Sequence, residues 1–262
     1  MSEKGSKIFG DTVPFKKKHA DELKSKMDKY LAKLGLHSVQ VGSTEDPDRD
    51  PEELASDLDT MVDLDDIINT LKPQLNPADK KDTVEKAARR ALSAAVQGLG
   101  LQTSQAGVNV FVRLPFGPNA HQVDLECIRK VAKVSRYHQH RIPKGSPYKG
   151  VSKQLMIASL AKQKGYVYSA WEGLFLRTPE NKKGELVADD WDEIAERLVG
   201  VKDGSRLGSV EAIMKSLPHD QAQALLAHVK QDKNWVEKPY SPQNLAETQL
   251  SWFKTISQKM SI

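Results

Sequence analysis

"SVQVGSTEDPDRDPEELASDLDTMVDL", residues 38–64, is the stretch that decides the fold. In it an apolar, strand-like run ends in a Gly-Ser pair, an acidic segment with two prolines follows, and a second strand-like run comes next. This second run has Asp57, Asp59 and Asp63 at alternate positions. Because residues two apart in a strand project to the same face, the pattern predicts a sheet with acidic side chains gathered on one face.

The composition is that of a charge-rich globular protein. With 262 residues, 39% hydrophobic and 28% charged, the chain can form one large domain or two ordinary ones. The N-terminus lacks the apolar core of a signal peptide, and no window approaches the ~20 apolar residues of a membrane span. We therefore expect a cytoplasmic protein that does not associate with membranes. The single cysteine, Cys127, is expected to be a buried apolar residue.

The formal net charge of +4 is distributed unevenly along the chain. Residues 45–66 are strongly acidic, whereas residues 129–153 are rich in lysine and arginine, with tyrosine and histidine rings among them. A cationic stretch interleaved with rings suits a phosphate-rich partner such as a nucleotide, DNA or RNA. An ordinary solvated surface explains the stretch equally well when it is judged alone. The sequence indicates no oligomeric state.

Hydrophobic periodicity predicts a mixture of helices and strands. We expect helices over 15–34, with Gly35 as the stop, over a short segment ending near 72–73, and over 76–100. Strands are expected over 37–43 and 56–64, and a hairpin is expected from 107–116 and 121–128. This order favours an α+β fold in which a mixed sheet is covered by helices on one face.

Asp124 lies in the last of these strands and can join Asp57 and Asp59 from a neighbouring strand. Ionised carboxylates within a few Å of one another repel strongly unless they are protonated or neutralised. Two Mg²⁺ ions, held ~3.5–4 Å apart by shared carboxylates, clamp the attacking and leaving oxygens of a phosphoryl displacement. We therefore predict a site for two Mg²⁺ ions, with Mn²⁺ as a possible substitute. The alternative is that the three aspartates are helix caps, turn residues or solvent-facing strand residues.

The order of Gly-Ser, Asp-x-Asp and a later Val-Asp-Leu is similar to the signature of the DNA polymerase β nucleotidyltransferase superfamily. The stretch "YKGVSKQLMIASLAKQKGYVYSAWEGLF", residues 148–175, resembles the thumb segment of family X DNA polymerases. In that family a Tyr-Phe-Thr-Gly-Ser turn leads into a helix, a Lys-Gly corner and a strand. Residues 184–200 resemble its closing helix. The resemblance covers residues 37–200.

The resemblance implies a metal-dependent nucleotidyltransferase. Such an enzyme moves a nucleotide from a nucleoside triphosphate to an acceptor hydroxyl, here a DNA or RNA 3′ end, and releases pyrophosphate. The implied domains are an N-terminal helical segment, a palm, a small α/β thumb and a helical appendage, over 1–36, 37–142, 143–200 and 201–262. Asp57, Asp59 and Asp124 would be the catalytic metal ligands, and Asp63 would face solvent or lie behind them.

Further residues are expected to contact the substrates. The resemblance implies nucleotide binding by Gly42, Ser43, Tyr148 and Ser152, with Tyr148 stacking on a base or sugar. The basic segment adds phosphate or nucleic-acid contacts by Arg141, Lys144, Lys149 and Lys153. The strand pattern predicts a thumb core formed by Tyr166, Tyr168, Trp171 and Phe175.

The chain departs from the family in the loop after Gly42-Ser43, where the family has a helix with a basic residue aimed at the phosphates. The loop here is acidic and Pro-rich, Arg49 is its only cation, and we expect at most a short helix over 52–55. The family's sugar-recognising ring pair is incomplete, and we expect no DNA-gripping module before residue 37. The alternative function is therefore a catalytically weak or inactive nucleotidyltransferase fold that binds nucleic acid or another protein.

Overall fold

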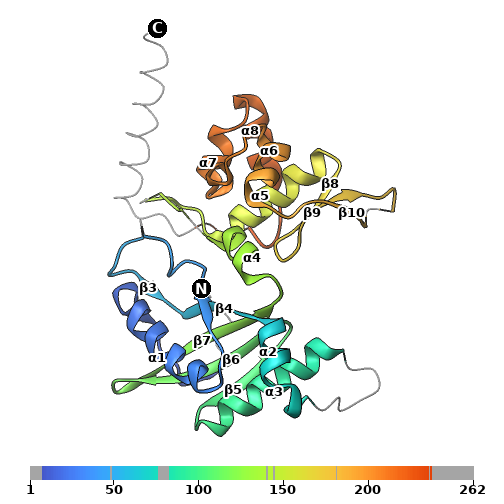
Figure 1. Cartoon of the computed structure of the whole chain (residues 1–262). Coiled ribbons are helices and arrows are strands. Elements are labelled where there is room, and N and C mark those ends of the chain that lie inside the picture. Colours follow the sequence, from blue (N-terminus) through green and yellow to red (C-terminus); the bar gives the residue numbers. More distant parts are fainter. Residues whose placement is uncertain are drawn as a thin grey trace. The chain divides into compact units, whose positions relative to one another are not determined.

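The computed structural model describes residues 8–47, 49–75, 83–139, 141–143, 145–180, 182–235 and 237. The chain divides into two compact units, Met1–Gln139 and His140–Ile262 (Figure 1). Within the described residues, none of the helices is long and apolar enough to cross a membrane.

A five-stranded mixed sheet forms the centre of the first unit. Its order is β2-β4-β7-β6-β5, with the bounds Ser38–Gln40, Asp57–Asp63, Asn119–Ile128, Asn109–Phe116 and Gln102–Ala106. β4 and β7 are parallel, whereas the other neighbours are antiparallel. The predicted hairpin is confirmed as β6 and β7. The sequence does not predict β5, because its residues, QTSQA, have no apolar alternation.

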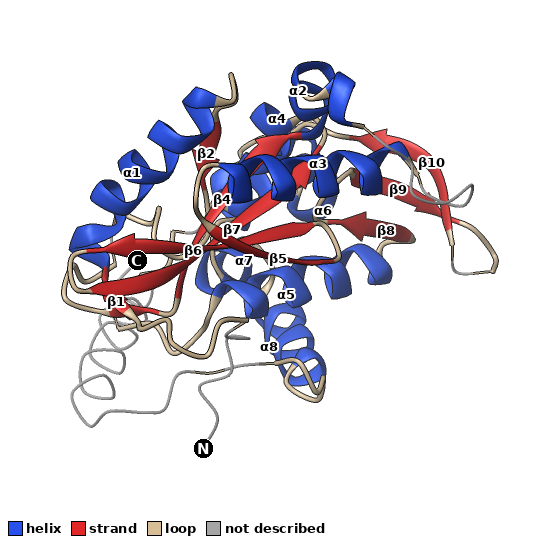
Figure 2. Cartoon of the chain, turned by 90° about the horizontal axis from the view of Figure 1, so that it is seen from below, coloured by secondary structure: helices blue, strands red, loops and turns tan. Residues whose placement is uncertain are grey.

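Three helices cover one face of this sheet and bury its core (Figure 2). They are α1, α2 and α3, with the bounds Ala20–Lys33, Leu64–Thr70 and Val84–Gly98. The buried residues Leu23, Met27 and Leu31 are spaced by four in α1, so they form one apolar stripe against the sheet. On β4 their core partners are Leu58 and Val62. The α+β architecture with helices on one face of a mixed sheet is thus confirmed.

The beginning of the predicted helix over 15–34 is a strand instead. Phe15–Lys16 forms β1, which pairs with β3, Leu54–Ala55, in a small two-stranded sheet. A 3-10 turn over Lys17–His19 then leads into α1. The short helix expected over 52–55 is wrong for the same reason, because the backbone there is used to pair with the N-terminal segment.

The predicted helices that end near 72–73 and that span 76–100 are both found among the described residues, whereas the helix that follows β7 is not predicted. α2 and the 3-10 helix Lys72–Gln74 account for the short helix predicted to end near 72–73. α3 begins after Thr83, whose side chain accepts a hydrogen bond from Lys86 N at 3.3 Å. The preceding part of that predicted helix, 76–82, lies outside the described residues. α4, Val131–His138, follows β7.

The second unit has a three-stranded antiparallel sheet, β10-β9-β8, with the bounds Lys183–Ala188, Gly173–Arg177 and Tyr166–Ser169. Its helices are α5, α6, α7 and α8, with the bounds Gly150–Gln163, Trp191–Val199, Val210–Lys215 and His219–Val229. A 3-10 turn spans Gly204–Leu207. Both α7 and α8 contact α5. The helical pattern predicted after 237 lies outside the described residues.

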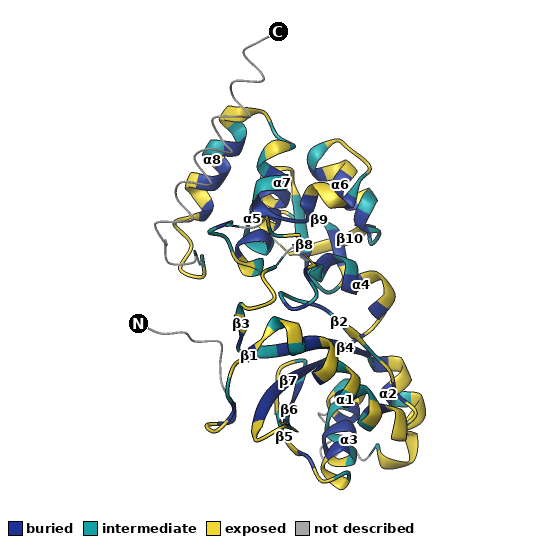
Figure 3. Ribbon diagram, turned by 90° about the vertical axis from the view of Figure 1, so that its left-hand side faces the viewer, coloured by how far each residue is buried: buried dark blue, intermediate teal, exposed yellow. Residues whose placement is uncertain are grey.

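The core of the second unit is mainly aliphatic, with Trp191 also among its buried residues. Buried residues of α5 include Met156, Ile157 and Leu160, and Leu174 and Ile194 are also buried. Figure 3 shows how buried positions alternate with exposed ones along the helices. The four rings expected to form this core are only partly buried, so that prediction is wrong: Tyr166, Tyr168, Trp171 and Phe175. The chain reverses direction between β8 and β9 within this stretch, so the four rings do not lie on one continuous strand.

Candidate active site

Acidic side chains gather on the sheet face opposite α1, α2 and α3. Asp59 of β4 pairs in register with Asp124 of β7, and Asp57 pairs with Gln122. Leu58, between the two β4 aspartates, belongs to the core on the helix side. Because side chains alternate along a strand, the aspartates point away from that core. The structure thus brings the three predicted metal ligands together on two neighbouring strands.

A fourth carboxylate, Glu126, joins this face two residues after Asp124. Its Oε2 atom is buried and has no hydrogen-bond partner among the described residues. The sequence analysis missed Glu126, although in "HQVDLECI" the polar residues Gln122, Asp124 and Glu126 alternate with apolar ones and must share a face. We call Asp57, Asp59, Asp124 and Glu126 the acidic cluster.

Burial raises the pKa of both aspartates on β4, and like charge adds to the shift of Asp59. For Asp59, burial contributes most, the charges of the other three carboxylates add to it, and the pKa lies well above the ordinary range. Burial also raises the pKa of Asp57. The positive charge of Arg49 opposes both shifts. Ionisation of these groups is therefore unfavourable without a nearby cation.

The carboxylates on β7 show the same effect. Burial raises the pKa of Asp124 to about 7, against a hydrogen bond from Gln122 and with the charge of Asp57 added. Burial also raises the pKa of Glu126 to about 7, and the charge of Asp124 contributes. Such strong shifts are typical of functional sites, because they arise where charged groups are held together out of water.

Gly42 packs directly on the acidic cluster. Its φ is +75°, and a Cβ atom at this position would lie 2.3 Å from Asp59 Oδ2. The preceding residue is fixed as well, because Val41 N donates to Asp59 O at 3.0 Å. Only glycine combines this backbone conformation with so close an approach. Gly42 and the partly exposed Ser43 therefore form a turn beside Asp59.

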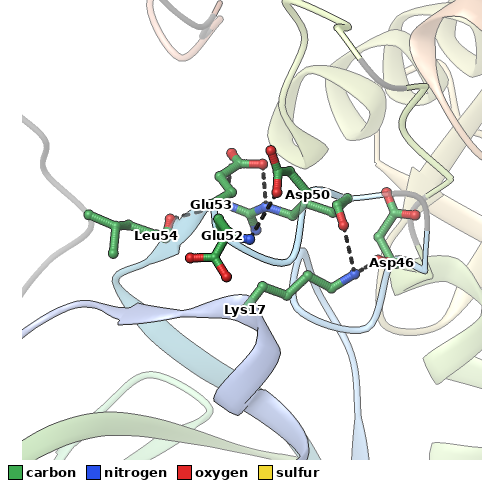
Figure 4. A network of polar contacts seen from close by, with 7 residues as sticks. Lys17, Asp46, Asp50, Glu52, Glu53 and Leu54 are labelled. Carbon is green, nitrogen blue, oxygen red and sulfur yellow. Dashed lines mark hydrogen bonds and ion pairs between the residues drawn. The ribbon is translucent and has the colours of Figure 1, made fainter.

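The acidic loop that follows is tied to the N-terminal segment (Figure 4). Glu52 forms ion pairs with Lys16 and Lys18 at 2.8 and 2.7 Å, and these two lysines lower its pKa to about 2. Lys17 Nζ donates to the main-chain carbonyls of Asp46 and Arg49. The three successive lysines thus hold the loop from one side, which the sequence analysis did not foresee.

Arg49, the only cation of the loop, is engaged within it. Its Nε lies 2.8 Å from Glu53 Oε2, and its Nη2 donates to Glu53 Oε1 at 3.0 Å and to Leu54 O at 3.3 Å. Its charge nevertheless lowers the pKa of Asp57 and Asp59. Arg49 is therefore near the acidic cluster while bound to Glu53.

Asp63, at the end of β4, has a structural role. Its Oδ1 accepts from Asp65 N at 2.9 Å and caps α2, and its Oδ2 accepts from Val131 N at 3.1 Å, at the start of α4. The carboxylate thus satisfies backbone donors of two helices. Asp63 was expected to face solvent or to lie behind the metal ligands; its side chain is partly exposed, and both of its oxygens also accept from the backbone.

The predicted substrate contacts of the second unit differ in accessibility. Arg141 and Lys149 are exposed. Tyr148 is partly buried and packs edge-on against Trp235, with 5.6 Å between the ring centres. Lys144 lies outside the described residues.

Two of these predicted contacts are buried in the structure. Ser152, predicted to bind nucleotide, is 0% exposed in the first turn of α5, and Lys153, predicted to contact phosphate, is 1% exposed. Lys153 Nζ lies 5.8 Å from the ring centre of Trp191, the first residue of α6. Both side chains face the interior because they lie on the packed side of α5, so neither can meet a phosphate at the surface.

The acidic cluster suits a hard divalent cation by its chemistry. Carboxylate oxygens are the ligands that Mg²⁺ prefers, and the unpartnered Glu126 Oε2 and the raised pKa values show that the positive charge of Arg49 does not fully compensate the cluster. Within the part of the chain that the structure describes, however, no three His, Cys, Asp or Glu side chains are arranged as a ready-made metal site.

Comparison with known protein families and with characterised proteins finds no match to this chain. A functional assignment consequently depends on the geometry and electrostatics of the acidic cluster and of the Gly42-Ser43 turn.

Proposed function

We propose that the protein is a metal-dependent nucleotidyltransferase. In the proposed reaction a hydroxyl, at a nucleic-acid 3′ end, attacks the α-phosphate of a nucleoside triphosphate, and pyrophosphate leaves. The register pairing of Asp59 with Asp124 is the observation on which the proposal depends. It supports the proposal because it places the Asp-x-Asp strand and the later acidic strand side by side, as the chemistry requires.

The three aspartates of the cluster each have a role in this proposal. Mg²⁺, or Mn²⁺ in its place, would neutralise the phosphates and lower the pKa of the acceptor hydroxyl. Asp57 and Asp59 would hold the metal of the nucleotide, and Asp124 would hold the metal next to the acceptor. Because Gly42 packs on Asp59, a triphosphate bound by the backbone of this turn would lie beside the carboxylates.

The second unit has exposed cations that would bind phosphate. Arg141 and Lys149 are the predicted phosphate contacts that are exposed, and their charge suits the phosphates of the nucleotide or of a DNA or RNA acceptor. Ser152 and Lys153 are not part of this proposal, because both are buried.

One observation favours the second candidate, a fold of weak or no activity that binds nucleic acid or another protein. The only cation of the loop after Gly42-Ser43, Arg49, is paired with Glu53, and the loop is otherwise acidic. A triphosphate approaching this loop would meet negative charge unless Arg49 left Glu53.

The two candidates are separated by calorimetry and a transfer assay on the full chain. We expect nucleoside triphosphate binding that requires Mg²⁺, and incorporation of an α-labelled nucleotide into DNA or RNA. Asp59→Asn should abolish incorporation, whereas the matched control Asp66→Asn, at an exposed position of α2, should retain it. Absence of metal-dependent nucleotide binding would contradict the proposal, and nucleic-acid binding without any transfer would support the second candidate.

A further inference from the structure

Two hydrogen bonds in series connect the N-terminal segment with Asp124. Gln122 Nε2 donates to Asp124 Oδ1 at 2.8 Å, and Gln122 Oε1 accepts from Ile8 N at 3.0 Å. Gln122 is 1% exposed and Asp124 is 8% exposed. Because water has little access to these groups, the carboxylate depends on the amide donor that the protein supplies.

The orientation of the Gln122 amide is fixed by its partners. The two ends of an amide have nearly the same shape, and only the hydrogen-bond network distinguishes them. Ile8 N–H can only donate, so it must meet Oε1, and the Nε2 donor is then directed to Asp124. A reversed amide would put donor against donor at Ile8 and acceptor against acceptor at Asp124.

The segment that presents Ile8 N is itself held on the sheet. Val13 N donates to Ala120 O at 3.0 Å. Arg113 of β6 donates to the Asp11 carboxylate from Nε at 2.9 Å and from Nη2 at 2.5 Å. The donor at Ile8 is therefore positioned by contacts to β7, the strand that carries Gln122, and to its neighbour β6.

Gln122 also occupies a particular place within the acidic cluster. It is the register partner of Asp57, and it precedes Asp124 by two residues on the same face of β7. Like-charge repulsion from Asp57 and Asp59 would turn the Asp124 carboxylate away from them. A donor bound to Oδ1 opposes this rotation and leaves Oδ2 available for a ligand.

We propose that Gln122 is a positioning residue that fixes the Asp124 carboxylate, and that Ile8 N–H in turn fixes Gln122. This inference rests on the proposed nucleotidyl transfer, in which Asp124 serves the acceptor side. Gln122 itself contacts neither nucleotide nor acceptor in this proposal. We call the two hydrogen bonds, from Ile8 N to Gln122 and from Gln122 to Asp124, the relay. Loss of the relay should therefore reduce turnover and metal affinity without changing the affinity for the nucleotide.

The relay can first be tested without any activity. In nuclear magnetic resonance spectra of the full chain, the side-chain amide signals of Gln122 are assigned by their loss in Gln122→Glu. We expect these protons to exchange slowly with water and to shift in Ile8→Pro, since proline has no N–H. Gly10→Pro is the matched control, because Gly10 is the second residue of the Phe9–Thr12 turn, where proline is favoured. Fast exchange, or signals unchanged by Ile8→Pro, would overturn the relay.

The functional part is tested with Gln122→Met, which keeps the side-chain length but has no amide. We expect kcat to fall roughly 10- to 100-fold and Mn²⁺ affinity, measured by electron paramagnetic resonance, to weaken, while KM for the nucleotide is unchanged. Ile8→Pro should change the same quantities in the same direction, and Gly10→Pro should match wild type. A lower melting temperature with unchanged Mn²⁺ affinity, or wild-type kcat in Gln122→Met, would overturn the proposal. Wild-type protein without any transfer activity would refute the proposed function, while Mn²⁺ affinity would still decide the role of Gln122.

Discussion

Asp59 and Asp124 are direct register partners on adjacent parallel strands, and each has a pKa raised by burial. Two like charges in such a position destabilise the folded protein whenever both are ionised. The pair therefore lowers the stability of the metal-free protein, and a cation bound between the carboxylates would remove the repulsion.

Asp59→Asn should raise the free energy of unfolding of the metal-free protein by about 1 kcal/mol, because it removes a buried charge from the acidic cluster. The same substitution should abolish nucleotide transfer. Urea unfolding and the transfer assay measure the two effects. Asp66→Asn removes an equal charge from an exposed site and should change neither quantity appreciably, so a stability gain of similar size in that variant would refute the explanation by crowding.

Asp124→Ala should remove turnover and leave Mg²⁺-nucleotide affinity nearly unchanged, because Asp57 and Asp59 still hold the metal of the nucleotide. Turnover, calorimetric nucleotide affinity and melting temperature on this one variant distinguish the alternatives. If Asp124 is only a structural strand residue, the substitution will lower stability and nucleotide affinity together. An active Asp124→Ala protein would mean that the acidic cluster has no catalytic role.

The stability of the metal-free protein should fall as pH rises from about 4 to 7. In the unfolded chain the carboxyls of Asp124 and Glu126 ionise near pH 4, whereas in the folded protein both pKa values are raised to about 7. The folded state therefore binds more protons than the unfolded chain across this window. The stability that these two carboxyl groups contribute is fully present below pH 4 and is lost above pH 7. Urea unfolding at a series of pH values measures this decline.

Glu126→Gln should flatten that decline by about 1.4 kcal/mol for each unit of pKa shift that it removes. Mg²⁺ should restore stability most strongly above pH 7, where the cluster is ionised and able to bind it. The expected result is a shallower pH profile for the variant than for wild type. Parallel profiles would show that Glu126 ionises in the folded protein as it does in the unfolded chain.

Gly42→Ala should reduce transfer by at least an order of magnitude, because the added Cβ would have to displace the Asp59 carboxylate or the turn that packs on it. Gly35→Ala is the matched control. Gly35 has a similar φ of +71°, but its nearest atom is Thr70 Cγ2 at an ordinary 3.5 Å. Both variants should lose about 1 kcal/mol of stability from backbone strain, and equal activity losses would exclude a specific contact between Gly42 and Asp59.

Asp63→Ala should act on stability instead of chemistry. The loss of a helix cap costs about 1 kcal/mol, and the loss of the second backbone acceptor at Val131 adds to this. Residual activity at low temperature should match wild type once the folded fraction is accounted for. A kcat that falls while the melting temperature stays constant would instead place Asp63 among the catalytic groups.

Local periodicity was sufficient to predict the elements that hold the acidic cluster. The alternation of apolar and acidic residues in β4 predicts both its strand state and the shared face of Asp57 and Asp59. Phe15, by contrast, was placed in a helix, because its pairing with Ala55 depends on contacts between segments far apart in the sequence.

Side-chain environments were harder to predict than strands. Lys153 belongs to a basic segment, and its burial beside Trp191 depends on how α5 and α6 pack, which the spacing of charges does not reveal. Glu126 is the exception, because strand alternation alone places it on the same face of β7 as Asp124.

The parallel pairing of β4 with β7 has a consequence for the order of events during synthesis. Parallel neighbours need a crossover connection, and here it contains α2, α3 and the strands β5 and β6. A ribosome-bound chain that ends before β7 has Asp57 and Asp59 but lacks their partners on the adjacent strand. The first unit should therefore acquire its acidic cluster only in a late, long-range folding step, and ions that bind the cluster should act on the completed sheet and not on the emerging chain.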